Sequence, residues 1–168
     1  MSHSSKKPGP DRPSVEAMTQ VKPIPEGFGT VTPNLVVADG AAAIEFYERA
    51  FGAQVVARLE AGGMLVHAAL RIGDAMVTLC DAMPPHGMVA PDPGGPVPSF
   101  ITLYVEDAET LHARAVAAGA TEINPVADHV HGDRAGSVRD PFGHRWATAT
   151  HVRDVSEEEL VKQLEAMS

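Results

Sequence analysis

Histidine and carboxylate side chains gather most densely in one short stretch of the chain, from Asp128 to Asp133. The stretch reads Asp-His-Val-His-Gly-Asp, so it places two histidines and two carboxylates within six residues. Imidazole and carboxylate groups bind divalent metal ions, although a His-x-His pair is also common on solvated loops. Two interpretations stay open: a metal-binding loop, or the polar rim of a site.

Two other side chains have reactive chemistry but no evident partner. His67 can act as a general base or orient a ligand, because imidazole titrates near neutral pH, yet no carboxylate is paired with it. Cys80 is the only cysteine, which excludes an intrachain disulfide, and no neighbouring residue would activate its thiol. We therefore expect a hydrogen-bonded strand histidine and a small buried side chain.

An internal repeat indicates which elements position these side chains. Leu35–Asp39 leads into a helix that stops at Gly52, and Leu103–Asp107 leads into a second helix that stops at Gly119. In both copies an aspartate is suited to cap the helix start, and a glycine supplies the left-handed residue at its end. Such a repeat indicates two modules of the same architecture.

Each copy continues into three further strands separated by turn residues. With the first strands at 31–37 and 100–105, the remaining strands are expected at 54–59, 64–72 and 75–81, and at 122–126, 134–139 and 145–152. Ser156 and Glu159 form a capping box that predicts a C-terminal helix. The fold class is therefore α+β, with two tandem βαβββ modules followed by a helix.

The domain organisation follows from these elements. Residues 1–26 are rich in Ser, Lys and Pro and are expected to form a flexible N-terminal extension, with no apolar segment typical of a secretory signal. Residues 27–153 form one domain, with modules 27–82 and 98–153 joined by a Pro- and Gly-rich linker, 83–97. The C-terminal helix occupies 154–168.

Composition excludes several classes of protein. The chain has 168 residues, of which 44% are hydrophobic, enough for a single domain with a core. A net charge of −9 argues against binding to nucleic acid or an anionic membrane and favours a cationic or neutral ligand. Apolar stretches are too short to span a bilayer. One cysteine suits a reducing compartment, so we expect a cytoplasmic protein.

Three stretches carry a family resemblance. The first stretch is residues 32–53, and the second is Leu-Arg-Ile-Gly-Asp at 70–74. The third, residues 132–146, contains Gly-Asp-Arg followed by Val-Arg-Asp-Pro-Phe-Gly-His-Arg-Trp. Their order and spacing resemble the vicinal oxygen chelate superfamily of glyoxalase I, ring-cleaving dioxygenases and bleomycin-resistance proteins, and within it the PhnB-like branch. The resemblance implies that curved sheets surround a cup, with helices on the convex side.

Relatives similar to glyoxalase I hold a metal ion with His or Glu side chains on the first and fourth strands of each module. The matching positions here are Thr32, Thr78, Phe100 and Ala147. None is a good ligand for a transition metal, which needs imidazole, carboxylate or thiolate donors. We therefore expect no metal at the inherited position and no cofactor.

Alternation along the strands predicts which other side chains face the cup. The expected mixture of apolar walls with a few hydrogen-bonding groups is typical of a pocket for an organic ligand, although a filled core would look similar. Trp146 faces the opposite way and is expected beneath the second helix. The predicted ligand-binding residues are Thr32, Asn34, His67, Met76, Thr78, Phe100, Thr102, Tyr104 and Arg145.

Three functions fit these observations. The first is a metal-independent binding protein, similar to bleomycin-resistance proteins, that sequesters an antibiotic or another aromatic or amphipathic small molecule. The second is a lyase or isomerase that uses His67, Tyr104 or Arg145. The third is a structural module with a filled cup. Because open modules leave unpaired sheet edges, we also expect a homodimer.

Overall fold

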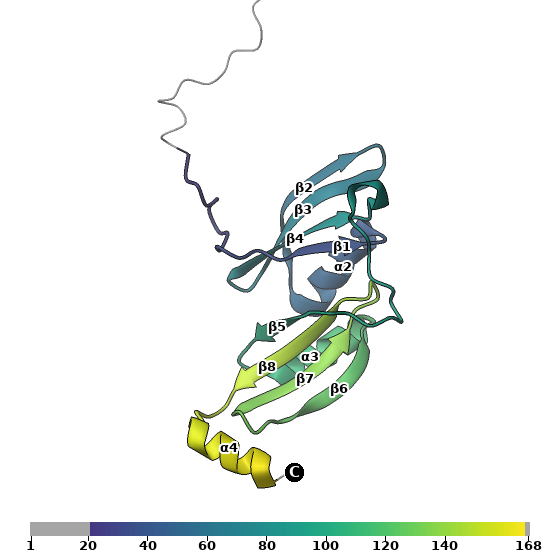
Figure 1. Ribbon diagram of the computed structural model, residues 1–168. Coiled ribbons are helices and arrows are strands. Elements are labelled where there is room, and N and C mark those ends of the chain that lie inside the picture. Colours follow the sequence, from purple (N-terminus) through teal and green to yellow (C-terminus); the bar gives the residue numbers. More distant parts are fainter. Residues whose placement is uncertain (1–20, 167–168) are drawn as a thin grey trace, which may run out of the picture.

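The computed structural model describes residues 21–166, so most of the expected extension and the last two residues lie outside it. Two modules with the same topology follow one another (Figure 1). Their sheets have the strand orders β1-β4-β3-β2 and β5-β8-β7-β6. In each sheet the first strand runs parallel to the fourth, and the other neighbours are antiparallel. The α+β fold with two βαβββ modules is confirmed.

The elements agree closely with those expected. The first module holds β1 (Asn34–Val37), α2 (Gly40–Phe51), β2 (Gln54–Ala61), β3 (Met64–Ile72) and β4 (Ala75–Asp81). A short 3-10 turn, η1 (Pro84–His86), lies in the linker. The second module holds β5 (Phe100–Tyr104), α3 (Ala108–Ala118), β6 (Thr121–Asp128), β7 (Asp133–Arg139) and β8 (Arg145–His151), and α4 (Glu157–Ala166) follows it.

Both repeated helices begin and end as their sequences predict. The carboxylates of Asp39 and Asp107 accept hydrogen bonds from the amides three residues on, at 3.0 and 2.9 Å. Gly52 and Gly119 adopt left-handed conformations, with φ of 68° and 119°, that few other residues tolerate. The local capping chemistry therefore fixes the length of each helix.

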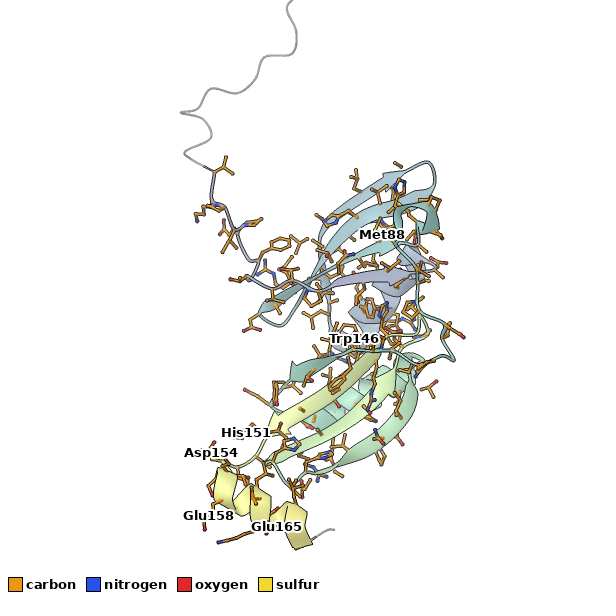
Figure 2. The ribbon with its side chains drawn as sticks, in the orientation of Figure 1. Met88, Trp146, His151, Asp154, Glu158 and Glu165 are labelled. Atoms are coloured by element: carbon orange, nitrogen blue, oxygen red, sulfur yellow. The ribbon has the colours of Figure 1, made fainter. Side chains whose placement is uncertain are left out.

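Aromatic side chains join the two modules into one core. Tyr47 and Phe51 on α2 contact Trp146 on β8, with ring centroids 5.4 and 4.7 Å apart. Trp146, labelled in Figure 2, lies at the boundary between the modules and is fully buried. It therefore packs against rings of the first helix, a contact that the sequence analysis, which expected Trp146 beneath the second helix, did not predict.

Asp140 holds this junction together through four hydrogen bonds. The Tyr47 hydroxyl and the Trp146 Nε1–H each donate to Oδ2 at 2.8 Å, and the amides of Phe142 and His144 each donate to Oδ1 at 2.9 Å. Burial, followed by the Asp140 charge, raises the pKa of Tyr47 well above its ordinary value. The Asp-Pro-Phe-Gly-His-Arg-Trp motif is thus a structural junction.

Two local expectations are corrected. The first strand begins at Asn34 rather than Val31, because residues 31–33 lie outside the ladder that pairs Asn34 with Thr78. Period-two alternation along β3 predicts Val66 on the helix-covered face with Ala68 and Leu70, but Val66 remains exposed. The β2–β3 register shifts beside it, and Leu65 packs against the backbone of Gly40 instead.

The C-terminal helix is attached at one end of the second module (Figure 1). The amides of Val152 and Arg153 donate to the Gly132 carbonyl at 3.0 and 3.1 Å. Half of the expected capping box forms, because the Glu159 amide donates to the Ser156 hydroxyl at 3.2 Å. The Glu159 carboxylate instead accepts a hydrogen bond from Arg153 at 2.8 Å.

Candidate functional site

The concave face of the first sheet is largely closed by the chain itself. Met76, Thr78 and Cys80 on β4 point away from α2, yet they are only 3%, 8% and 4% exposed. The Cys80 thiol lies 3.7 Å from the Met88 sulfur in the linker, and the backbone of Gly27 lies beside the Arg71 guanidinium group. These neighbouring segments leave little room for a ligand on this face.

The concave face of the second sheet is open and forms a cavity of about 330 Å³. Phe100 and Tyr104 on β5 are 58% and 64% exposed there, unusually high values for aromatic side chains within a sheet. The cavity is lined by Phe100, Thr102, Tyr104, Asn124, His129, His131, Asp133, Ala135, Gly136, Ser137, Arg145, Ala147 and Ala149. An apolar floor thus meets a few polar groups, as in sites for organic ligands.

One end of this cavity is built by Phe100 and Arg145, which are paired across β5 and β8. The guanidinium carbon of Arg145 lies 5.3 Å from the centroid of the Phe100 ring, a cation–π geometry. Its Nη2 lies 3.4 Å from the Ser137 hydroxyl. Its Nε is buried without a hydrogen-bond partner among the described residues, so this side chain retains donor capacity.

A network centred on Asp133 forms the other end. The Tyr104 hydroxyl donates to Oδ2 of Asp133 at 2.7 Å, and Nδ1 of His151 lies 2.7 Å from Oδ1. Nε2 of His131 lies 3.5 Å from Oδ2. On its far side, Nε2 of His151 lies 3.0 Å from Asp154, beside the start of α4 (Figure 2). The network links β5, β7, β8 and the segment leading into α4.

These contacts shift the protonation equilibria of the network. The hydrogen bond with Asp133, and then that with Asp154, raises the pKa of His151. Hydrogen bonds from His151 and then Tyr104 lower the pKa of Asp133. The hydrogen bond to Asp133 also raises the pKa of Tyr104. At neutral pH Asp133 is therefore ionised and Tyr104 keeps its proton.

The residues at the inherited metal positions do not fit a metal ion. The Thr32 hydroxyl lies 3.4 Å from the Gly29 carbonyl, and the Thr78 hydroxyl donates to Asn34 at 2.8 Å. Phe100 and Ala147 offer no donor atom at all. Within residues 21–166 no three His, Cys, Asp or Glu side chains gather as a metal-binding group. In the Asp128–Asp133 stretch, Asp128 pairs with Arg134 and Asp133 with His151.

The predicted ligand-binding residues divide between the two sheets. Phe100, Thr102, Tyr104 and Arg145 come together in the open cavity. Thr32, Asn34, His67, Met76 and Thr78 belong to the first module and do not line that cavity. The single cup expected from both modules is therefore not formed within one chain.

Several residues of the cavity and of the Asp133 network were missed as site candidates. Asn124, Ser137 and His151 did not enter the expected set, and Asp133 and His131 entered only as part of a loop. Extending the period-two alternation along β7 and to the end of β8 would have found most of them, because Asp133, Ser137 and His151 share the face of Arg145.

Comparisons with known proteins agree with this fold. The model of the glyoxalase/bleomycin resistance protein/dioxygenase superfamily matches residues 27–148, so the chain belongs to this superfamily. An uncharacterized protein of Mycobacterium bovis is 41% identical over 134 residues, which cover 77% of this chain and 88% of that protein. An uncharacterized protein of Mycobacterium tuberculosis strain H37Rv is also 41% identical over 134 residues, covering 77% and 79%.

Solved structures share the architecture. TioX from Micromonospora sp. ML1 is 29% identical, with a TM-score of 0.60 over 74% of this chain and 99% of TioX. A glyoxalase-related enzyme from Fulvimarina pelagi is 24% identical, with a TM-score of 0.59 over 73% of this chain and 87% of that enzyme, and shows the fold alone. Among residues 21–166 no helix is long and apolar enough to cross a membrane.

Proposed function

We propose that this protein is a metal-independent small-molecule-binding protein of the PhnB-like branch, which sequesters an antibiotic or aromatic metabolite in the cytoplasm. The observation that carries the proposal is the open cavity of about 330 Å³ with Phe100 and Tyr104 exposed on its wall. Exposed aromatic side chains in a concave site supply large contact areas to flat ligands. Thr102, Asn124 and Arg145 offer polar groups that would orient an amphipathic molecule.

The absence of donor side chains at the inherited metal positions supports metal independence. A ligand can gain affinity from stacking and hydrogen bonds alone, so no ion is required for binding. We expect EDTA to leave both the melting temperature and ligand affinity unchanged. Metal analysis of the purified protein would overturn this part of the proposal if it returned a stoichiometric transition metal whose removal destabilises the fold.

A thermal-shift screen of aromatic compounds, followed by calorimetric titration of a hit, tests the binding function. Phe100→Ala removes a ring from the cavity and should weaken binding by about 1–2 kcal/mol, roughly fivefold to thirtyfold. Val116→Ala, on the outer surface of α3, is the control and should have no effect. Equal affinities of wild type and Phe100→Ala would mean that the ligand binds elsewhere.

We propose that two copies form a homodimer through the first module. β2 is a free edge strand whose residues are all exposed, including Val55, Val56 and Leu59. β6, the equivalent edge strand of the second module, contains Pro125, which disfavours pairing along that edge. An unprotected apolar edge is usually covered by a partner.

Light scattering tests this assembly. The wild type should have twice the chain mass of 17.7 kDa, and Leu59→Asp should shift it toward monomer. Val116→Asp provides a matched control on a different surface and should remain dimeric. A wild-type monomer at micromolar concentration would contradict the proposal.

A lyase or isomerase activity is the second candidate, favoured by the Asp133 network on the cavity wall. The Tyr104 hydroxyl and the His131 imidazole both contact Asp133, and side chains of these types can position or transfer a proton of a bound substrate. Incubating a bound ligand with protein in D₂O and following its C–H signals by NMR tests this alternative. Exchange catalysed by wild type but not by Asp133→Asn would support it, and an unchanged ligand would rule it out.

A further inference from the structure

Resting on the proposed binding function, we infer that the ligand is a planar aromatic anion, a ring system carrying a carboxylate or phenolate group that pairs with Arg145. The inference begins with the unused hydrogen-bonding capacity of this side chain. Arg134 and Arg153 each bind carboxylates of the chain, whereas no carboxylate of the described residues pairs with Arg145. Its weak contact with Ser137, at 3.4 Å, leaves most of its donors for a ligand.

The buried Nε of Arg145 strengthens this assignment. A guanidinium nitrogen that is shielded from water and lacks an acceptor is unfavourable, and a negative charge bound beside the guanidinium group would offset part of that cost. The fork of the two Nη groups matches the two oxygens of a carboxylate, and such paired bonds are stronger than bonds to neutral acceptors. An acidic group therefore fits this end of the cavity better than an amide or a hydroxyl.

The Phe100 ring fixes where the acidic group must be attached. Because the guanidinium group lies over that ring, with the carbon 5.3 Å from its centroid, it is held beside the apolar wall of the cavity. A ligand that stacks on the wall can reach Arg145 only through a group close to the plane of its own rings. An acid bonded directly to an aromatic ring meets that condition.

The dimensions suggest the size of the ring system. Phe100 and Tyr104 are four residues apart on β5, which corresponds to about 13 Å along the strand. A fused bicyclic or tricyclic system spans most of that length. At the far end, the Tyr104 O–H is already committed to its hydrogen bond with Asp133, so the hydroxyl oxygen is left to accept a hydrogen bond from a ligand donor.

The charge balance inside the cavity differs from that of the whole chain. The net charge of −9 favours a cationic ligand at long range. Among residues 21–166, however, Asp133 is the only carboxylate that lines the cavity, and it is already paired with His151 and Tyr104. Arg145, His129 and His131 line the same surface. Because exposed charges are screened over about 8 Å at physiological salt, the local cation decides the preference.

Three matched probes test the inference: a naphthalene carboxylate, the corresponding carboxamide and the corresponding aminomethyl compound. Wild type should bind the carboxylate about tenfold or more tightly than the amide, and the cationic amine most weakly. Arg145→Gln should remove this preference by weakening the carboxylate while leaving the amide unchanged. Arg145→Lys keeps the positive charge but lacks the forked pair of donors, so it should retain part of the preference for the carboxylate.

The outcomes separate the two proposals. Equal affinity for acid and amide in wild type, or preference for the amine, would overturn the anionic assignment and leave the binding function intact. If Arg145→Gln weakened the binding of all three probes equally, Arg145 would have a structural role instead. If wild type were a dimer and Arg145→Gln a monomer in light scattering, Arg145 would have an intersubunit role. If neither these probes nor the aromatic screen gave a ligand, both proposals would fail.

Discussion

The two modules share strand order, helix caps and register, yet they use their concave faces in opposite ways. Asn34 pairs with Thr78 in the first sheet as Thr102 pairs with Ala147 in the second. The positions two residues after Asn34 and Thr102 are therefore equivalent, and so are those two residues before Thr78 and Ala147. At those positions the first module has Val36 and Met76, whereas the second has Tyr104 and Arg145. A few substitutions on one scaffold therefore separate a closed apolar face from an open polar cavity.

Neighbouring segments complete this difference. The linker places Met88 against Cys80, and the segment before β1 places Gly27 against Arg71, so the β4 side of the first concave face is covered, whereas Asn34 and His67 remain exposed. The linker residues before β5 instead bind the end of β7, where Arg139 donates to the Pro93 carbonyl at 3.1 Å. They leave Phe100 and Tyr104 exposed. The comparison teaches that the role of each module depends on what its connecting segments cover.

Breaking the junction between the modules should have the largest effect. Asp140→Ala leaves two buried and two partly buried donors without their acceptor, and each unpaired buried donor costs about 1–3 kcal/mol. Since neighbouring structure and water recover part of this loss, we expect the free energy of unfolding to fall by about 3–5 kcal/mol in urea denaturation.

Asp154→Ala, at an exposed carboxylate, is the control and should change stability by less than about 0.5 kcal/mol. Asp140→Asn retains one acceptor oxygen, so its free energy of unfolding should fall less than that of Asp140→Ala. A loss below about 1 kcal/mol for Asp140→Ala would mean that the shared aromatic core alone holds the modules together.

Filling one concave face at a time sharpens the comparison. Thr102→Trp inserts an indole into the open cavity beside the small side chain of Ala147 and should weaken ligand binding by about 1–3 kcal/mol, roughly fivefold to 150-fold. Asn34→Trp makes the same change at the equivalent position of the first module and should leave affinity unchanged. Calorimetric titration of both variants with the same ligand measures the two affinities. Matching losses would show that both faces contribute to the site.

The His151–Asp133 pair should produce a smaller, pH-dependent effect. The contribution of His151 to stability is present below its unfolded-state pKa, near 6.5, and is lost as pH rises through its raised folded-state pKa. The contribution of Asp133 is present above its unfolded-state pKa, near 3.8, and is lost as pH falls through its lowered folded-state pKa. The pair therefore stabilises the fold most between about pH 4 and 6.5.

Melting curves of wild type and His151→Gln across this range provide the measurement. The difference in melting temperature should be largest near pH 5–6 and should shrink above the raised pKa of His151. His86→Gln, in the linker, is the control. A difference that grows from pH 6 to 8 would have the wrong sign and would contradict the assigned pairing.

Local signals made most of the fold predictable from the sequence. Asp39, Asp107, Gly52 and Gly119 act within one helical turn of their positions, so their types alone predict the helix boundaries. The shift of β3 at Val66 was not predictable, because it depends on Leu65 packing against Gly40 across the module.

The candidate site was less predictable. Alternation identified Phe100, Thr102, Tyr104 and Arg145 as inward-facing, because each strand repeats every two residues. It gave no information about what lies over a sheet, so Met76 and Thr78 looked equally available. The contact between Tyr104 and Asp133 joins residues on different strands and requires the tertiary register. Sequence patterns thus predicted which face each residue occupies but not which face is open.

Thiol reactivity tests that central claim most directly. The native Cys80 reports on the first concave face, and a thiol introduced by Thr102→Cys in a Cys80→Ala background reports on the second. Under native conditions we expect the introduced thiol to react with a disulfide reagent about tenfold or more faster than Cys80, and to be protected by bound ligand. Equal rates, or faster modification of Cys80, would contradict the account in which only the second module presents an open site.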